Sequence, residues 1–123
     1  MGHQNTTILV VDDDPAVRSA LAFSLQVEGF RVRAYRSGSD LLDDAALPDR
    51  GCLVIDYKLP DMTGLDLLSE LRRRQSVLPA ILITTHPSAS VREQAAAFAV
   101  QVVEKPLLSE TLFDAIRAAT ALH

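Results

Sequence analysis

Five short apolar segments, each followed by a loop and an amphipathic stretch, recur along this chain of 123 residues and constrain its fold more than any other feature. The apolar segments are Ile8–Val11, Arg31–Tyr35, Cys52–Ile55, Ala80–Thr84 and Val100–Val103. Short β-rich segments that alternate with helical periodicity predict parallel strands joined by right-handed helical crossovers. We therefore expect an α/β fold of the doubly wound class, in which helices cover both faces of one five-stranded parallel sheet.

The composition of the five segments indicates where each strand lies in the sheet. The first, third and fourth segments are almost entirely apolar, which is typical of central strands that are covered on both faces. The second segment alternates and carries Arg31 and Arg33. Charged side chains of this kind are typical of an edge strand.

Helical periodicity and capping residues predict five helices between and after the strands. The first begins at Pro15 after Asp14 and ends before Gly29. The others are expected from a Ser37 or Ser39 cap through Leu41, Leu42 and Ala45, from a Thr63 cap through Leu65, Leu68 and Leu71, over Val91–Phe98, and from a Ser109 cap through Leu112, Ile116 and Ala119. The basic run Arg72–Arg74 is interpreted as a helix C-terminus rather than a nucleic-acid patch, because cations are favourable there.

Composition excludes several classes of protein. The chain is 48% apolar and 23% charged with a net charge of −4, which predicts one globular domain that does not bind nucleic acid by itself. The lone Cys52 excludes a disulfide framework and fits a reducing compartment. No apolar run reaches the roughly 18 residues of a membrane span. Gly2 and Thr6 fit a loose myristoylation pattern, but an unmodified flexible N-terminus over residues 1–5 is the favoured interpretation, so we expect a cytoplasmic protein.

Polar residues of three kinds stand at the ends of the apolar segments or within two positions after them. They are the carboxylates Asp12, Asp13 and Asp56, the hydroxyl of Thr84 and the ammonium of Lys105. In parallel α/β sheets, ligands bind beyond the carboxyl ends of the strands, so these groups are expected to converge. Neighbouring carboxylates repel one another unless a hard cation such as Mg²⁺ relieves the repulsion. A carboxylate in such a site can accept a phosphoryl group, with Lys105 and Thr84 stabilising the transferred oxygens.

Four motifs in chain order resemble those of bacterial response-regulator receiver domains. The motifs are Val10-Val11-Asp12-Asp13-Asp14-Pro15, Ile55-Asp56-Tyr57-Lys58-Leu59-Pro60-Asp61-Met62-Thr63-Gly64, Ile83-Thr84 and Glu104-Lys105-Pro106. Each motif alone fits an ordinary turn, cap or surface charge, and their combination is specific. The similarity is greatest to receivers of the nitrogen-fixation regulator (FixJ-like) type and covers about residues 6–120, within a domain expected over 6–123.

The resemblance implies a fold and a set of residue roles. The fold would be flavodoxin-like with strand order 2-1-3-4-5. Asp56 would be the phosphoacceptor, Asp13 would bind Mg²⁺ directly, Asp12 would hold it through water, and the backbone carbonyl of Lys58 would complete the protein ligands. Thr84 and Lys105 would contact the phosphoryl group, and the Lys105–Pro106 bond would be cis.

The resemblance also implies partners. The phosphoryl donor would be a sensor histidine kinase, a phosphotransfer protein or a small acyl phosphate. The output would pass to another protein or to a homodimer that forms through the fourth helix, fifth strand and fifth helix. The chain would catalyse only its own phosphotransfer and dephosphorylation, in a two-component phosphorelay.

The chain departs from the family pattern in three features. The aromatic residue usual three places before the lysine is Val102, the small residue usual after the threonine is Thr85, and the usual Gly-Ala before the last strand is Phe98-Ala99. We hypothesise that the signalling face is atypical, with Phe98 either a substitute aromatic switch or simply a core residue. Lys58 and His86 would flank the path of a hydrolytic water.

Other functions remain as alternatives. A phosphatase of the haloacid dehalogenase type is disfavoured, because neither Asp12 nor Asp56 begins the Asp-x-Asp-x-Thr run that such enzymes need. A phosphate-independent receiver-like scaffold is kept open by Thr85 and Val102. The chain could also be the receiver fragment of a longer DNA-binding regulator, although no recognition helix follows the last helix here.

Overall fold

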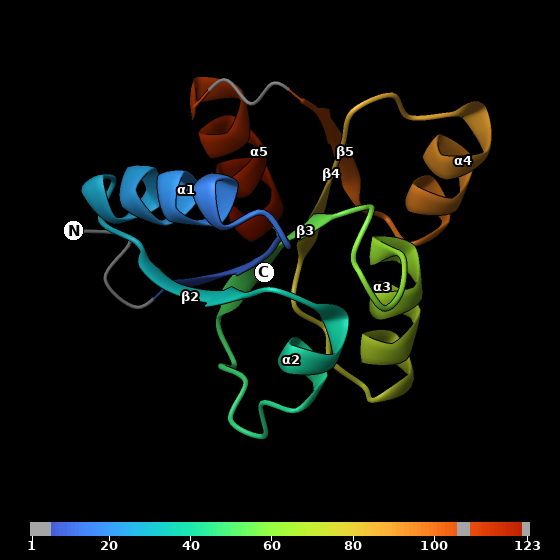
Figure 1. The fold of residues 1–123 in the computed structure, drawn as a ribbon, viewed down its shortest axis with the longest axis horizontal. Helices are drawn as coiled ribbons and strands as arrows, with labels where there is room; N and C mark the ends of the chain where they lie inside the picture. Colours follow the sequence, from blue (N-terminus) through green and yellow to red (C-terminus); the bar gives the residue numbers. More distant parts are fainter. Residues whose placement is uncertain (1–5, 106–108, 122–123) are drawn as a thin grey trace.

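The computed structural model describes residues 6–105 and 109–121, without the side chains of residues 109 and 110, and shows one sheet between two layers of helices (Figure 1). The parallel strands of the described residues are β1 (Thr7–Val11), β2 (Arg31–Tyr35), β3 (Gly51–Asp56), β4 (Ala80–Thr84) and β5 (Gln101–Glu104). Their order in the sheet is β2-β1-β3-β4-β5. The expected α/β class, flavodoxin-like order and strand positions are therefore confirmed, with shifts of one residue at some strand ends.

Burial follows the predicted division between central and edge strands. Every residue of β3 and β4 is buried, and β1 is buried from its second residue onward. In contrast, Arg31 and Arg33 of β2 are exposed at the edge of the sheet. The apolar strands therefore form the centre of the core because both of their faces are covered.

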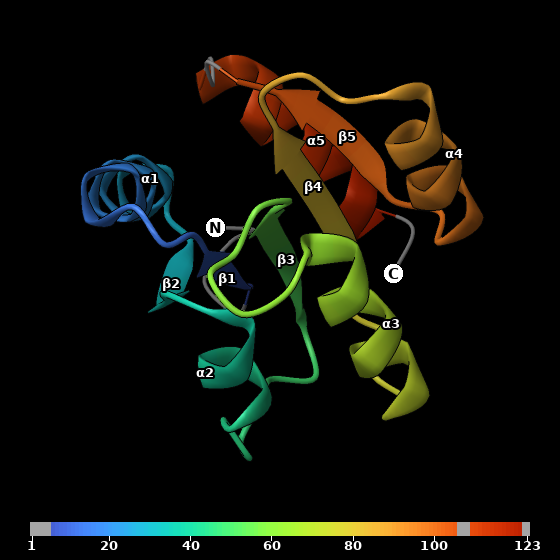
Figure 2. The same cartoon turned by 45° about the vertical axis from the view of Figure 1, so that its right-hand side comes forward.

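The helices of the described residues are α1 (Pro15–Val27), α2 (Gly38–Leu42), α3 (Gly64–Arg73), α4 (Ala89–Ala97) and α5 (Ser109–Ala121). One core cluster joins the sheet to α1 and α5 through Leu25 and Ile116. The other cluster joins the opposite face to α2, α3 and α4 through Leu41, Leu68 and Ala95. Figure 2 shows this division, with α2, α3 and α4 on the side of the sheet away from α1 and α5.

The N-termini of the helices follow their capping residues. Asp14 accepts a hydrogen bond from the Ala16 amide at 2.9 Å, and Thr63 forms a reciprocal capping box with Asp66. Ser37, rather than Ser39, caps α2. The expectation that α2 continues through Ala45 is wrong, because the helix ends at Leu42.

Two further expectations concern the fourth and fifth helices. The fourth helix begins two residues earlier than predicted, at Ala89, because Ser88 caps it by accepting a hydrogen bond from the Val91 amide at 3.1 Å. The Ser109 side chain that was proposed as a cap, the cis Lys105–Pro106 bond and the N-terminal residues 1–5 lie outside the part of the chain that the structure describes.

The run Arg72–Arg74 lies at the C-terminus of α3, as predicted. Arg73 and Arg74 both form ion pairs with Glu70, at 2.5 and 2.9 Å. Arg72 instead donates a hydrogen bond to the Ser76 carbonyl at 3.0 Å. The three arginines therefore have different surroundings, although they are adjacent in the sequence.

Cys52 is a buried free thiol, as the sequence predicted, and burial raises its pKa to about 12. A thiol with this pKa stays protonated at neutral pH and is a poor nucleophile. Within the described residues, no helix has the length and apolar character that crossing a membrane requires.

Candidate functional site

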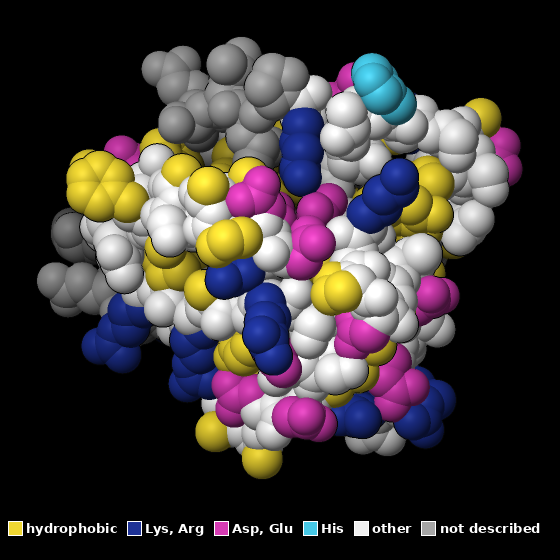
Figure 3. Space-filling model, viewed as in Figure 1, with side chains coloured by type: hydrophobic (Ala, Val, Ile, Leu, Met, Phe, Trp, Pro, Cys, Tyr) yellow, Lys and Arg dark blue, Asp and Glu magenta, His cyan; other side chains and the backbone are white. Residues whose placement is uncertain are grey.

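The carboxyl ends of four strands bring the predicted polar residues to one rim of the sheet. Asp12 directly follows β1, Asp56 ends β3, Thr84 ends β4, and Lys105 directly follows β5. Figure 3 shows acidic side chains beside basic ones near the centre of this face. The sheet therefore assembles residues that are up to 93 positions apart in the chain, from Asp12 to Lys105.

Asp12 is the most deeply buried acid of the rim, with 1% of its surface exposed. Its Oδ1 accepts a hydrogen bond from the Asp14 amide at 2.9 Å. Its Oδ2 has no hydrogen-bond partner among the described residues, and the Lys105 ammonium lies 3.7 Å away. A buried carboxylate oxygen without a hydrogen bond is costly, so this atom is a natural ligand for a cation.

Asp56 faces both a positive and a negative neighbour. Its Oδ2 accepts a hydrogen bond from Lys105 Nζ at 3.2 Å, and its side chain is 9% exposed. Burial raises the pKa of Asp56, the charge of Asp12 raises it further, and Lys105 partly offsets both effects. The carboxylate is therefore more basic than an ordinary aspartate and lies where an additional cation would be favourable.

Carboxylate oxygens of Asp12, Asp13 and Asp56 lie within 4.8 Å of one another. This spacing suits a single hard divalent cation, which prefers oxygen ligands and would satisfy Asp12 Oδ2. Asp13 is exposed, so a bound ion would keep contact with solvent water. The residues present therefore fit Mg²⁺, and Lys105 alone cannot balance three carboxylates.

A cleft of about 530 Å³ opens beside Asp56. Its walls include Asp13, Lys58, Thr84, Thr85, His86 and Lys105. Thr84 is 8% exposed, and its carbonyl accepts a hydrogen bond from the Lys105 amide at 2.9 Å, which ties β4 to the segment that carries Lys105. The cleft thus gathers the predicted acceptor, hydroxyl, ammonium and both residues proposed to flank a hydrolytic water.

The start of α3 packs directly under the acceptor. Gly64 donates its amide to the Tyr57 carbonyl at 2.7 Å. A Cβ atom at Gly64 would lie 2.7 Å from the Asp56 carbonyl oxygen and 2.8 Å from Leu82. Only glycine therefore permits this approach of helix and strand, which fixes the position of the Asp56 backbone.

Two residues of the site were not identified from the sequence. Arg18 of α1 donates to the Asp12 carbonyl at 2.8 Å, which anchors the loop after β1. Asp61 accepts hydrogen bonds from the amides of Gly38 and Ser39 at 3.1 and 2.9 Å, which joins the loop after β3 to the start of α2. Asp61 stands in the motif quoted above, but its partners lie more than 20 positions away in the sequence.

Two of the positions that depart from the family pattern pack on the same side of the core. Val102 and Phe98 are both partly buried and pack against the core cluster beneath α2, α3 and α4. Thr85 is exposed in the wall of the cleft. Whether Phe98 moves with the state of Asp56 stays a prediction.

The chain is similar in sequence to known response regulators. A family profile described as "Response regulator receiver domain" matches residues 8–117. The transcriptional regulatory protein FixJ of Azorhizobium caulinodans is 35% identical over 94% of this chain and 55% of its own length. The response regulator protein TmoT of Ectopseudomonas mendocina is 35% identical over 99% of this chain and 56% of its own length. The chain therefore spans about half the length of the curated relatives it matches.

Solved structures agree with the sequence matches. A crystal structure of FixJ-N superposes with a TM-score of 0.87 at 34% identity, covering 96% of this chain and 95% of that one. The response regulator StyR superposes with a TM-score of 0.84 at 30% identity, covering 96% of this chain and 60% of that one.

Proposed function

This chain belongs to the receiver-domain family of response regulators, and from that premise we propose that it accepts a phosphoryl group on Asp56. The proposal rests on the position of the Asp56 carboxylate, whose Oδ2 lies 3.2 Å from Lys105 Nζ. The same carboxylate belongs to a group of three that fits a divalent cation. The donor is a sensor histidine kinase or phosphotransfer protein, and acyl phosphates are small substitutes.

The transfer uses the basicity of Asp56. One carboxylate oxygen attacks the phosphorus of a phosphohistidine, a P–O bond forms, and the P–N bond breaks. The released imidazole takes up a proton from water. Because burial and Asp12 raise the pKa of Asp56, its carboxylate has a stronger tendency to attack than a solvated aspartate.

The surrounding residues stabilise the transferred group. The ammonium of Lys105 and the hydroxyl of Thr84 are the donors available to phosphoryl oxygens at the end of β4 and β5. Asp12, Asp13, Asp56 and the backbone carbonyl of Lys58 would hold Mg²⁺, which supplies charge neutralisation for the phosphoryl oxygens when bound.

The consequence of phosphorylation is a change in a protein-interaction face. Thr84 ends β4 and Lys105 directly follows β5. Because α5 contacts both of these strands and α4 contacts β5, a change at Asp56 would reach the α4, β5 and α5 surface through them. An output protein or a second copy of the chain would bind there. The chain acts as a switch in the cytoplasm and catalyses only its own phosphorylation and dephosphorylation.

Intact-mass spectrometry after incubation with acetyl phosphate and Mg²⁺ tests the proposal. The wild type should gain one phosphoryl group and Asp56→Asn should gain none, whereas the control Asp49→Asn, an exposed position, should behave as the wild type. An equal gain in Asp56→Asn would contradict the assignment. No gain from acetyl phosphate or from any cognate kinase would favour a phosphate-independent scaffold.

A further inference from the structure

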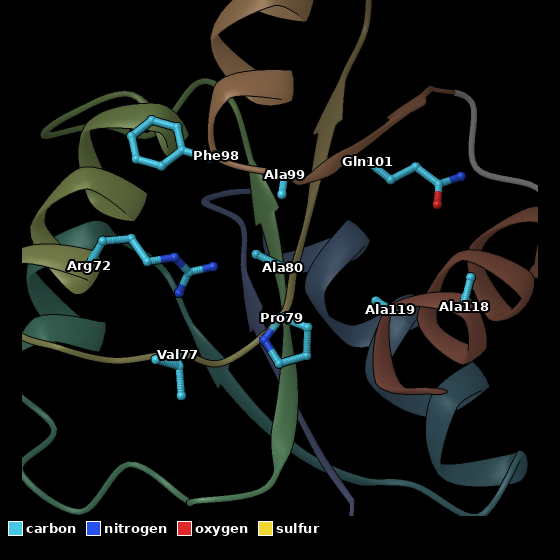
Figure 4. A pocket seen from close by; sticks show the side chains of 9 residues that line it. All are labelled: Arg72, Val77, Pro79, Ala80, Phe98, Ala99, Gln101, Ala118 and Ala119. Carbon is cyan, nitrogen blue, oxygen red and sulfur yellow. The ribbon is translucent and has the colours of Figure 1, made fainter. Parts of the chain in front are cut away.

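A groove of about 380 Å³ lies at the end of the sheet opposite to the acceptor cleft. The cleft adjoins Thr84 at the end of β4, whereas the groove adjoins Ala80 at its start. Figure 4 shows Phe98 and Arg72 on one side of the groove and Ala119 of α5 on the other. Because the two sites are separated by the length of a buried strand, the groove does not belong to the acceptor site.

The walls of the groove are mainly apolar and open to solvent. Val77, which precedes β4, is 76% exposed, and it is one of three large apolar side chains of the described residues with high exposure. Phe98 at the end of α4 is partly exposed although it also packs against the core. Exposed apolar side chains that gather around a hollow are typical of a surface that binds an apolar group.

Arg72 gives the groove a positive charge that no described carboxylate balances. Burial lowers its pKa, and no ion pair with an acidic residue offsets that effect among the described residues. Its hydrogen bond to the Ser76 carbonyl engages Nη1 and leaves other guanidinium donors available. Figure 4 shows the guanidinium directed toward Pro79 and Ala80, into the middle of the groove.

The two arginines that follow Arg72 in the sequence are paired with a carboxylate, whereas Arg72 is not. Arg73 and Arg74 both pair with Glu70 on the surface of α3. The unpaired arginine is thus the one whose side chain lines the groove. A half-buried guanidinium beside apolar walls is suited to a carboxylate that arrives together with an apolar group.

The backbone at the edge of the groove is also unusual. Ala99 has a φ of 58°, in the left-handed region that favours glycine. This conformation reverses the chain between α4 and β5 and places Ala99 in the wall of the groove. Strained backbone of this kind is common at binding sites.

We propose that this groove binds a segment of a partner protein in which an apolar side chain is followed by an acidic residue. The apolar side chain would lie between Phe98 and Ala119, and the carboxylate would accept hydrogen bonds from Arg72. The size of the groove suits a single large side chain and its neighbours rather than an extended interface. The interaction goes beyond the acceptor function and does not require phosphorylation of Asp56.

NMR titration of the ¹⁵N-labelled chain with synthetic peptides tests the proposal. The probe is a capped peptide with one Phe followed by two Asp residues, and the matched peptide carries Asn in place of both Asp residues. The first peptide should cause saturable shifts at Ala80, Ala99 and Ala119. Loss of the charged hydrogen bonds should weaken binding about tenfold, both for the Asn peptide and for the Arg72→Gln chain.

Control variants separate the groove from the rest of the molecule. Arg74→Gln and Asp56→Asn should bind the acidic peptide as the wild type does, the latter because groove binding is independent of the acceptor. Ala119→Leu is a second test that does not depend on the fold of the Arg72→Gln chain. It fills the groove without changing its charge and should abolish binding. No saturable shift at the groove with millimolar peptide, or equal affinity for the Asn peptide, would overturn the proposal. Equal affinity for free phenylacetate would overturn the assignment to a protein partner.

Discussion

Lys105 at the acceptor rim and Arg72 in the groove are partly buried cations near opposite ends of β4, and their surroundings differ in one respect. Lys105 Nζ lies 3.2 Å from Asp56 and 3.7 Å from Asp12. Arg72 has no carboxylate within ion-pair distance among the described residues. The rim therefore carries excess negative charge and would bind a cation, whereas the groove carries excess positive charge and would bind an anion. The unbalanced charge at each end of the sheet is therefore opposite in sign to the charge of the ligand that we expect there.

Removing the two cations should have very different effects on stability. Lys105→Met leaves two buried carboxylates without their cation, so the free energy of unfolding should fall by about 2–3 kcal/mol. Arg72→Met removes a cation that has no anionic partner, so the change should stay below about 1 kcal/mol. Urea unfolding at neutral pH measures both. Equal losses for the two variants would remove the contrast between the ends of the sheet.

The pH dependence of stability should reveal the charge repulsion at the rim. The pKa of Asp56 in the folded state is raised above its ordinary value of 3.8. At pH values between 3.8 and the folded pKa, the folded state therefore binds more protons than the unfolded state. The carboxylate therefore destabilises the fold at neutral pH, and this effect disappears as the pH falls through the folded pKa. Asp56→Asn should be more stable than the wild type at pH 7, with a gain that shrinks toward pH 4.

The difference in unfolding free energy between the wild type and Asp56→Asn separates the effect of Asp56 from that of other acidic residues. Glu70, for example, has its pKa lowered to about 2 by hydrogen bonds from Arg73 and Arg74, so its contribution is lost as the pH falls in both chains alike. Urea unfolding of both chains across this pH range gives the difference directly. A gain for Asp56→Asn that stays constant or grows as the pH falls would show that repulsion at Asp56 is not its cause.

The backbone also distinguishes the far end of the sheet from the rim. Among the described non-glycine residues, positive φ values occur at Gln75 and Ala99, which follow α3 and α4 at the far end. Ala99→Gly should raise the free energy of unfolding by about 0.5–1 kcal/mol, because glycine adopts this conformation without strain. Ala96→Gly, at an exposed position inside α4, should lower it by about 1 kcal/mol. Thermal unfolding of both variants checks the opposite signs, and a loss in both would show that Ala99 is not strained.

The rim was predictable from the sequence because its residues stand at the ends of the apolar segments or within two positions after them. Once parallel strands are inferred, chain order alone places Asp12, Asp56, Thr84 and Lys105 at one edge of the sheet. The central and edge strands were predictable for a similar reason, since burial on one or both faces changes composition. The early end of α2 was not, because Leu42 and Ala45 continue a helical pattern that the chain does not follow.

The groove could not be predicted in this way. Val77, Phe98 and Ala119 are far apart in the sequence, and each fits an ordinary loop or helix position. Which arginine of Arg72–Arg74 turns away from Glu70 depends on the direction of side chains on α3, which the sequence does not encode in a local pattern. Long-range contacts of this kind, like those of Asp61, become visible only in the folded chain.

The response of stability to Mg²⁺ tests the central claim, that the rim carries negative charge which a divalent cation balances. Urea unfolding of the wild type and of Asp13→Asn should be compared with and without millimolar Mg²⁺ at constant ionic strength. We predict that Mg²⁺ raises the free energy of unfolding of the wild type by about 1 kcal/mol. The variant should gain much less, because it lacks one of the three clustered carboxylates. An unchanged wild type, or an equal gain in Asp13→Asn, would contradict the account.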